Sequence, residues 1–458
     1  MGRLFGTDGV RGVWGESLTP ELLLRLSRAI GAYFGPGSRV LVGRDTRRGG
    51  DLAVGVVSAG LMYEGVKVYY AGITPTPSLQ LYVRDHGFDG GVMVTASHNP
   101  PEYNGVKVVG PDGVEISRED EERIEELYFK GEFGGPEVRG LLSSPVRVEG
   151  VNDYYVEKVA ERVDSEKIAK VKPRVVIDCG NGATSFTSPY IARKLGAKPL
   201  TLNCNPDPQF PSRHPEPTPE SLRDSAAVVR AIGAHLGVGH DADGDRAIVI
   251  DSRGEVHWGD RSGSLLARFA YENKLVNAPG RVYTGVSSSM LVEEYLKPAG
   301  IEVVWTPVGA VTISRRMMNE PGVAGFEENG GYIHPAHQYV RDGGMTMALM
   351  LYMLVTEGLD SSRLFSKLPK YYAVKTKVPV STRSEVQCFV EEAKSMFSGE
   401  RLILIDGVKA VGEDYWVLVR PSGTEPVVRI MVEARSPERA RELAESVAKS
   451  LSERCKKQ

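Results

Sequence analysis

The chain carries one pattern of apolar and polar positions three times. Each copy begins with a short apolar run that ends in a turn of small or polar residues: "RVLVGRDTRRGG" (39–50), "RVVIDCGNGA" (174–183) and "RVYTGVSSSM" (281–290). A stretch with helical patterning follows, then a glycine, then a second apolar run. Apolar runs that alternate with helical stretches are typical of parallel strands joined by crossover helices, and glycine commonly stops a helix. The pattern therefore predicts three βαβ units.

Each copy continues into a polar loop that contains or adjoins glycine. The loops are "TASHNP" (95–100) followed by "NGVKVVGPDG" (104–113), "DADGDR" (241–246) and "GFEENGG" (325–331). In open α/β sheets, ligands bind beyond the carboxyl ends of the strands. Loops at equivalent positions of three similar domains therefore predict one composite site between the domains.

The last part of the chain has a different pattern. From about Tyr371, the stretches 371–380 and 415–434 alternate as antiparallel strands do, and 437–457 has the spacing of an amphipathic helix. The predicted fold class is α/β, with three similar α/β domains that have mixed sheets, and a smaller C-terminal α+β domain, around a central cleft. The predicted domain boundaries are 1–150, 151–256, 257–370 and 371–458.

Composition and charge narrow the classes of function. A chain of 458 residues with 41% hydrophobic and 25% charged residues is ordinary for a globular protein of several domains. Its net charge of -3 provides no basic field for nucleic acid or a membrane surface, so neither is expected as a partner. The most apolar run, "MTMALMLYMLV" (345–355), is too short to span a bilayer and predicts a buried helix.

The cysteines and the N-terminus bear on location. The four cysteines lie far apart and form no CxxC pair, so we interpret them as buried or incidental thiols in a reducing compartment and not as a metal site. They are Cys179, Cys204, Cys388 and Cys455. The stretch "MGRLFGTDGV" (1–10) lacks the apolar core of a signal peptide. These features predict a cytoplasmic protein.

The "DADGDR" loop places three carboxylates at alternate positions, on Asp241, Asp243 and Asp245. Carboxylates this close repel one another unless a cation lies among them, and oxygen-only ligands favour a hard ion such as Mg²⁺. An EF-hand would need glutamate at its twelfth position, where this chain has Ser252. The structural alternative is a solvated acidic turn, which the closely spaced glycines around the aspartates disfavour.

The "TASHNP" loop presents the hydroxyl of Ser97 and the imidazole of His98 at the end of a strand. These residues could merely cap the strand, and the G-x-S-x-G elbow of α/β-hydrolases is absent. A serine that faces Mg²⁺ suits phosphoryl transfer, because the cation neutralises charge on the transferring oxygens. The metal loop therefore favours Ser97 as a nucleophile, with Lys107 as a nearby cation.

Two further loops suit a phosphate and a sugar. The stretch "RPSGTEPVVR" (420–429) combines guanidiniums, hydroxyls and backbone N–H groups, as a phosphate cradle does, although a surface turn is the alternative. Its candidate binding residues are Arg420, Ser422, Gly423, Thr424 and Arg429. The "GFEENGG" loop supplies the carboxylate of Glu327 and the amide of Asn329 for sugar hydroxyls, with an acidic glycine turn as the alternative.

Taken together, "FGTDGVRG" (5–12), "TASHNP", "DADGDR", "GFEENGG" and "RPSGTEP" (420–426) resemble, in this order, the motifs of the α-D-phosphohexomutase superfamily. That superfamily includes phosphomannomutase/phosphoglucomutase and phosphoglucosamine mutase. The resemblance implies an isomerase that moves phosphate reversibly between the 1- and 6-positions of a hexose phosphate. Phosphorylated Ser97 and a hexose 1,6-bisphosphate would be the intermediates, and Ser97 and the three aspartates would bind Mg²⁺.

The resemblance also implies roles for the remaining residues. Arg246, Glu327 and Asn329 would bind the sugar, and the fourth-domain loop would hold the phosphate that does not react. Arg11 and Lys107 match family positions implicated in catalysis, and His98 would support the serine loop. Closure of a movable fourth domain would exclude water, which would otherwise hydrolyse the phosphoserine.

Two departures from the family pattern concern the substrate and the role of the loop 306–311. Asn329 and Gly331 stand where many members have serine and histidine, and Ala310 stands where an acidic residue is frequent. The Glu-x-Asn-Gly-Gly form resembles archaeal-type phosphoglucosamine mutases with broad substrate use. Mannose, glucose and glucosamine phosphates are therefore all candidate substrates.

Two other functions remain open from the sequence. A Mg²⁺-dependent serine phosphatase would use the same serine and metal, but it would need access for water and no phosphate loop on a separate domain. A non-enzymatic sugar-phosphate sensor should have lost Ser97 or an aspartate, and none is lost. The expected partners are small-molecule hexose phosphates, and a homo-oligomer is compatible with the sequence.

Overall fold

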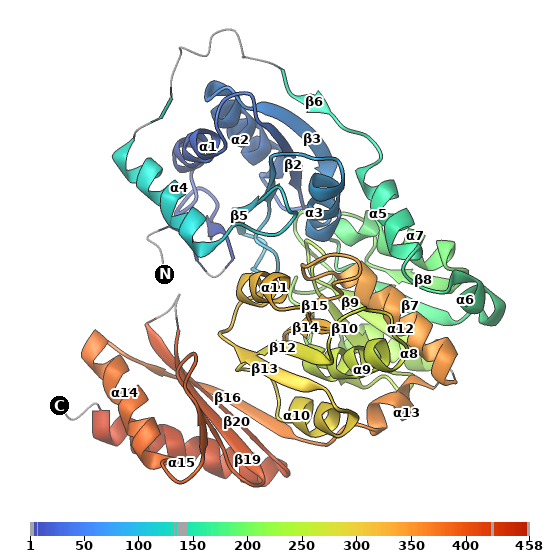
Figure 1. Cartoon of the computed structure of the whole chain (residues 1–458), viewed down its shortest axis with the longest axis vertical. Helices are drawn as coiled ribbons and strands as arrows, with labels where there is room; N and C mark the ends of the chain where they lie inside the picture. Colours follow the sequence, from blue (N-terminus) through green and yellow to red (C-terminus); the bar gives the residue numbers. More distant parts are fainter. Residues whose placement is uncertain are drawn as a thin grey trace.

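The fold consists of four sheets with their helices, arranged in chain order (Figure 1). It is known from a computed structural model, which describes residues 4–6, 8–131, 133–134, 144–358, 360–422 and 426–455. In Figure 1 the first sheet lies at the top, the second at the right, the third near the centre and the fourth at the lower left. This architecture confirms the predicted fold class, whereas the exact domain boundaries stay predictions.

The first sheet has six strands in the order β1-β5-β4-β2-β3-β6. They are β1 (Val10–Val13), β2 (Arg39–Arg44), β3 (Lys67–Ile73), β4 (Gly90–Val94), β5 (Tyr103–Val109) and β6 (Val146–Arg147). The helices in this part are α1 (Pro20–Phe34), α2 (Gly50–Tyr63), α3 (Thr76–Asp85) and α4 (Arg118–Lys130). Strands β4 and β5 form an antiparallel pair, and the loop between them contains the "TASHNP" motif.

The second sheet has five strands in the order β11-β10-β9-β7-β8. They are β7 (Arg174–Asp178), β8 (Lys198–Leu202), β9 (Leu236–His240), β10 (Ala247–Ile250) and β11 (Val256–His257). The helices in this part are α5 (Val151–Ala160), α6 (Ser165–Val171), α7 (Ser188–Lys194) and α8 (Arg223–Ile232). The "DADGDR" motif joins the antiparallel strands β9 and β10.

The third sheet has four strands in the order β13-β12-β14-β15. They are β12 (Arg281–Gly285), β13 (Glu302–Thr306), β14 (Ala324–Phe326) and β15 (Tyr332–Ile333). The helices in this part are α9 (Gly259–Glu272), α10 (Leu291–Leu296), α11 (Ala310–Asn319), α12 (Gly343–Glu357) and α13 (Ser361–Ser366). The "GFEENGG" motif connects β14 to the antiparallel strand β15.

The same four-strand order occurs in all three sheets: β5-β4-β2-β3, β10-β9-β7-β8 and β15-β14-β12-β13. The predicted βαβ pairs β2–β3, β7–β8 and β12–β13 are parallel, as expected for crossover connections. The glycines before β3, β8 and β13 have φ between 77° and 84°, which glycine adopts without strain. The three functional loops therefore occupy equivalent hairpins, as the repeat predicted.

Helix α12 confirms the prediction of a buried helix at 345–355. Twelve of its residues are buried, and its apolar side chains belong to the core that the second and third sheets share with their helices. No helix among the described residues is both long and apolar enough to cross a membrane.

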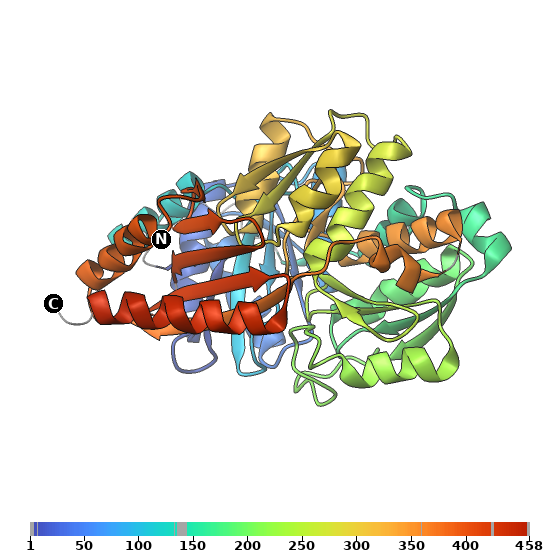
Figure 2. The same ribbon diagram turned by 90° about the horizontal axis from the view of Figure 1, so that it is seen from below.

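The fourth sheet has five antiparallel strands in the order β16-β20-β19-β18-β17. They are β16 (Tyr372–Pro379), β17 (Arg401–Ile403), β18 (Val408–Val411), β19 (Tyr415–Pro421) and β20 (Val427–Ala434). Helices α14 (Arg383–Met396) and α15 (Pro437–Cys455) cover one face of this sheet, and Figure 2 shows α15 running along it. The other face packs against the third domain.

A buried lysine joins the third and fourth domains. Lys409 Nζ lies 3.9 Å from the ring centroid of Trp305 and 4.2 Å from that of Trp416, and it donates to the carbonyl oxygen of Ser288 at 2.6 Å. Burial lowers the pKa of Lys409 to about 7, against the opposing effect of Glu433. Lys409 therefore contacts one tryptophan of each domain and joins the fourth sheet to the third domain.

The prediction of four free thiols is wrong. Cys179 is bonded to Cys204, and Cys388 is bonded to Cys455. Cys179 and Cys204 follow the parallel strands β7 and β8, whose register brings distant positions together. The sequence separations of 25 and 67 residues gave no sign of this. The cysteines therefore no longer support a reducing compartment, and the cytoplasmic location stays a prediction.

Candidate functional site

The serine loop between β4 and β5 has a strained backbone, and hydrogen bonds from neighbouring residues hold it in place. Ser97 is fully buried and has a φ of 50°, a conformation that costs a non-glycine residue on the order of 1–3 kcal/mol. Its N–H donates to Thr95 Oγ1 at 2.8 Å. The buried guanidinium of Arg47 donates to the carbonyl oxygen of Ser97 and, at 2.7 Å, to that of Asn99. Surrounding contacts therefore maintain the strained position of Ser97.

The serine loop meets the metal loop directly. Ser97 Oγ donates to Asp241 Oδ2 at 2.8 Å, although 144 residues separate them. His98 Nδ1 lies 3.4 Å from Ser97 Oγ. Burial and the guanidiniums of Arg246 and Arg11 lower the pKa of His98 well below its usual value. The imidazole beside the serine is therefore neutral near neutral pH.

The three aspartates of the β9–β10 hairpin fit a divalent cation. All are buried, and one oxygen of each lies within 4.8 Å of the others. Burial and the carboxylates of Asp243 and Asp245 raise the pKa of Asp241 well above its usual value. Among the described residues, Oδ1 of Asp243 and Oδ1 of Asp245 have no hydrogen-bond partner. Buried oxygens without partners, in an all-oxygen set, are suited to binding Mg²⁺.

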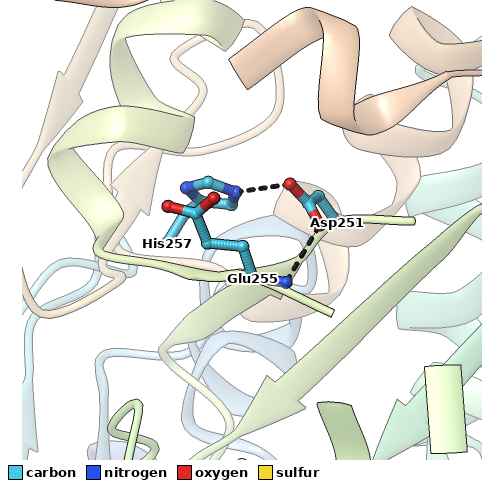
Figure 3. Close-up of side chains that lie close together, drawn as sticks. All are labelled: Asp251, Glu255 and His257. Carbon is cyan, nitrogen blue, oxygen red and sulfur yellow. Dashed lines mark hydrogen bonds and ion pairs between the residues drawn. The ribbon is translucent and has the colours of Figure 1, made fainter. Parts of the chain in front are cut away.

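A second group of metal-binding residue types lies in the β10–β11 turn and has a different character (Figure 3). Asp251 Oδ1 accepts from the N–H groups of Arg253 and Glu255, each at 2.9 Å. Its Oδ2 lies 3.0 Å from His257 Nε2. The imidazole of His257 stacks on Phe365 with a centroid distance of 3.7 Å. Both oxygens of Asp251 are thus occupied by contacts that hold the turn.

Lys107 brings a buried positive charge to the metal loop. Its Nζ lies 3.0 Å from carboxylate oxygens of Asp243 and Asp245 and 3.1 Å from Asp8 Oδ2. Burial opposes the charge, but these three carboxylates outweigh it and raise the pKa of Lys107. Burial likewise opposes the charge of Asp243, but Lys107 lowers the pKa of that carboxyl below its usual value. Lys107 therefore remains an ammonium ion beside the aspartates.

Arg11 connects the N-terminal loop to the serine loop. Its Nη2 lies 2.9 Å from Asp8 Oδ2, and its Nη1 donates to Asn99 Oδ1 at 2.8 Å and to the carbonyl oxygen of Ala96 at 3.2 Å. The sequence placed Arg11 near the site only through the family resemblance. The structure brings its guanidinium to the residues that flank Ser97.

The sugar loop lies next to the metal loop. Glu327 is buried, and Asn329 Oδ1 accepts from the N–H of Gly331 at 3.1 Å. Arg246 Nε lies 3.8 Å from Asp245 Oδ1 and forms no hydrogen bond with the described residues. The N–H of Ala247, directly after the metal loop, donates to the carbonyl oxygen of Gly330 in the sugar loop at 3.0 Å, so Arg246 and the sugar loop border the same space as the aspartates.

Three cations line up across the fourth sheet. Arg420 of β19 stands opposite Arg429 of β20, and Arg429 stands opposite Lys377 of β16. Directly opposed residues of antiparallel strands share a face, where like charges destabilise the sheet. Arg420 Nε donates to Asp406 Oδ2 at 2.6 Å, which offsets part of this charge. Guanidinium and ammonium groups are suited to binding an anion such as phosphate.

The rest of the predicted phosphate loop is only partly described. The N–H of Ser422 donates to the carbonyl oxygen of Val427 at 2.9 Å and so closes the turn between β19 and β20. Gly423 and Thr424 lie outside the described residues. Lys375 Nζ, on the same sheet, lies 2.9 Å from Glu328 Oε2 in the sugar loop. The fourth sheet therefore contacts the loop that contains Glu327 and Asn329.

Sequence reasoning missed several residues of the site. Arg47, Asp8, Arg341 and Lys377 all contact or flank the predicted residues, but each is a common charged residue without a distinctive spacing. A sequence signal was present for two of them: Asp8 lies within the motif "FGTDGVRG" (5–12), and Arg47 follows the first apolar run in "GRDTRRGG" (43–50). The position of Lys377 opposite Arg429 could be found only once the strand register was known.

Comparisons with known proteins cover nearly the whole chain. Models of phosphoglucomutase/phosphomannomutase match it in four parts: alpha/beta/alpha domain I at 2–135, domain II at 153–254, domain III at 258–372 and the C-terminal domain at 368–450. The chain is 50% identical over 451 residues to a phosphoglucosamine/phosphogalactosamine mutase of Sulfurisphaera tokodaii, covering 98% of this chain and 99% of the relative.

Two more proteins with mutase names are similar to the whole chain. A phosphoglucomutase/phosphomannomutase of Thermococcus kodakarensis is 40% identical over the full length of both chains. The crystal structure of a putative phosphomannomutase from Thermus thermophilus superposes with a TM-score of 0.83, at 29% identity and over 98% of each chain. The chain therefore belongs to the α-D-phosphohexomutase superfamily. It is a mutase, which is an isomerase by reaction class.

Proposed function

We propose that the protein interconverts the 1- and 6-phosphates of a hexose through a phosphoserine at Ser97. The observation that carries this proposal is the 2.8 Å contact of Ser97 Oγ with Asp241 Oδ2. It places a strained, buried hydroxyl against a carboxylate cluster that fits Mg²⁺. When bound, Mg²⁺ would be held by the three aspartates and a Ser97 oxygen, and it would neutralise charge on the transferring phosphoryl group.

The proposed transfer of the phosphoryl group takes place in two steps. The bond between phosphorus and Ser97 Oγ breaks, the free hydroxyl oxygen of the hexose phosphate bonds to phosphorus, and the proton of that hydroxyl ends on Ser97 Oγ. The product is a hexose 1,6-bisphosphate. After this sugar turns over, the reverse step returns its other phosphoryl group to Ser97.

Each flanking residue has a proposed task that its geometry supports. Lys107 and Arg11 supply positive charge beside Ser97, where charge accumulates on the phosphoryl oxygens. His98 packs beside the Ser97 hydroxyl as a neutral group. Arg246 offers an unused N–H next to the aspartates, which suits a hydroxyl or phosphate of the sugar.

The sugar and the distal phosphate would be held from two domains. Glu327 and Asn329 would bind sugar hydroxyls. The distal phosphate would lie on the fourth-domain loop, at Arg420, Ser422, Gly423, Thr424 and Arg429. Lys377 extends this cationic row and would strengthen phosphate binding by charge. Because relatives are named for glucosamine, galactosamine, glucose and mannose phosphates, mannose, glucose and glucosamine phosphates are the substrates to test first.

The test is a coupled mutase assay with these three 1-phosphates, primed with a trace of the corresponding 1,6-bisphosphate. We expect turnover with at least one of them, and loss of nearly all turnover in Ser97→Ala with an unchanged melting temperature. Ser185→Ala, which removes another buried hydroxyl in the second domain, is the matched control and should stay active. Wild-type rates in folded Ser97→Ala would refute the phosphoserine route, and release of inorganic phosphate without isomerisation would favour a phosphatase.

A further inference from the structure

Arg341 lies where three domains meet, in the loop between β15 and α12. Its side chain is 6% exposed. Its Nη2 lies 2.8 Å from Asp8 Oδ2 and 2.5 Å from Asp245 Oδ2, and its Nη1 lies 3.3 Å from Glu327 Oε2. One carboxylate comes from the N-terminal loop, one from the metal loop and one from the sugar loop. A guanidinium can serve several acceptors at once because its donors spread in a rigid plane.

The stem of Arg341 passes over Gly331, and this contact explains the glycine. A Cβ at position 331 would lie 2.3 Å from Arg341 Cδ and 2.8 Å from Arg341 Cγ. Gly331 does not have the positive φ that would by itself call for glycine, unlike its neighbour Gly330 with φ of 94°. Space for Arg341 is therefore the physical reason that position 331 has no side chain.

The contacts of Arg341 have consequences for the sugar loop and the metal loop. Glu327 is buried, so its carboxylate needs a hydrogen-bond partner, and that partner also holds it in one orientation. Arg341 is that partner. The same guanidinium occupies Oδ2 of Asp245, while Oδ1 of Asp245 has no partner among the described residues. Arg341 thus fixes the planes of two carboxylates, one for the proposed sugar site and one for the proposed metal site.

We propose that Arg341 is a positioning residue that sets sugar selectivity through Glu327, and that Gly331 is the residue that admits it. This inference rests on the proposed mutase function. Displacing Arg341 removes a partner from Asp8 and Asp245, which Lys107 also contacts, and this part of the effect is common to all substrates. Displacing Arg341 also alters the orientation of the carboxylate that meets the sugar hydroxyls, and this part affects different hexose phosphates to different extents.

The decisive experiment is a double-mutant cycle on kcat/KM with two hexose 1-phosphates. Gly331→Ala should lower kcat/KM by on the order of ten- to a hundredfold, because small displacements in a site have effects of this size. Arg341→Ala should do the same. In the Arg341→Ala background, Gly331→Ala should change kcat/KM by less than about twofold, since the atoms it meets are gone. Both single variants should change the ratio between the two substrates.

Control variants distinguish a positioning role of Arg341 from a general loss of folding or activity. Gly285→Ala adds a methyl group in the same domain where the nearest atom lies at 3.7 Å, an ordinary contact, so it should leave the rates and the substrate ratio unchanged. If Arg341→Ala does not fold, the double variant Arg341→Ala/Asp8→Asn removes one buried positive and one buried negative charge together. This double variant then serves as the background in which Gly331→Ala is tested.

Two results would overturn the inference. One is full additivity of Gly331→Ala and Arg341→Ala, which would show that the glycine has another purpose. The other is an equal loss with both substrates, which would show that Arg341 acts through the fold or the metal loop and not through Glu327. A wild-type protein without mutase activity would instead overturn the proposed function, and the two failures are therefore distinguishable.

Discussion

Replacing Arg420 with alanine tests whether the fourth domain holds the distal phosphate. Arg420 stands opposite Arg429 in the sheet, and its Nε already pairs with Asp406 at 2.6 Å. Its side chain is 15% exposed. Arg429 and Lys377 lie beside it in the same row of the sheet, so a phosphate bound there would meet more than one cationic side chain. Arg420→Ala should therefore weaken phosphate binding without lowering the melting temperature.

The expected loss of affinity in Arg420→Ala is that of one charge-assisted hydrogen bond. Such a bond contributes about 1.5–3 kcal/mol, which corresponds to roughly ten- to a hundredfold in substrate affinity. We expect KM for the hexose 1-phosphate to rise by this factor. Because Ser97 and the aspartates are unchanged, Ser97 should still accept a phosphoryl group. Poorer retention should also let more of the bisphosphate intermediate escape.

The assay compares Arg420→Ala with Arg435→Ala. Arg435 belongs to the same domain and pairs with Glu294 at 2.7 Å, but it lies outside the row of three cations. KM, kcat and released bisphosphate would be measured for both variants. An Arg420→Ala protein with unchanged KM and no extra bisphosphate would show that the loop is only a surface turn. An equal rise in KM for Arg435→Ala would show a general effect of charge and not a site.

Three further predictions follow from other parts of the molecule. Chelation should abolish mutase activity and Mg²⁺ should restore it, while Asp243→Asn should stay folded and need more Mg²⁺; full activity in excess chelator contradicts the metal assignment. Burial lowers the pKa of His334 to about 3. Between pH of about 6.5 and 3 the unfolded chain therefore binds a proton at this residue that the folded chain does not bind. The contribution of His334 to the free energy of unfolding is lost as the pH falls through this range, at about 1.4 kcal/mol per pH unit. His334→Leu should lose that part of the slope in denaturant titrations, whereas the exposed His214→Gln should keep it. Removing the Cys388–Cys455 bond, which spans 67 residues, should cost about 4 kcal/mol in the chain-entropy model; titration of free thiols in denaturant without reductant should find none, and four free thiols would contradict the pairing.

The repeated pattern made most of the fold predictable. A glycine after each helix and an apolar run on either side determine the βαβ unit locally, so β2–β3, β7–β8 and β12–β13 could be inferred. The antiparallel pairing of β5, β10 and β15 with the strand before each functional loop was not assigned, because the apolar pattern within one strand does not give the direction of its neighbour.

The site was predictable where several reactive or charged side chains occur together within one short motif. Ser97 and the aspartates could be identified because few purely structural turns need that combination. Arg341 could not be identified, since its contacts depend on the space above Gly331 and on three loops that meet only in the folded chain. The cysteine pairs were missed for the same reason, as their proximity depends on strand and helix packing.

The most direct test of the central claim is to follow the phosphoryl group on Ser97. The protein would be incubated with a hexose 1,6-bisphosphate, freed of ligand, and digested for mass spectrometry of the peptide that contains Ser97. The account predicts one phosphoryl group on Ser97, which disappears within a turnover time when hexose phosphate is added, with an equal amount of bisphosphate formed. Continued isomerisation by protein that never carries phosphate on Ser97, or a phosphoserine that hexose phosphate does not discharge, would contradict it.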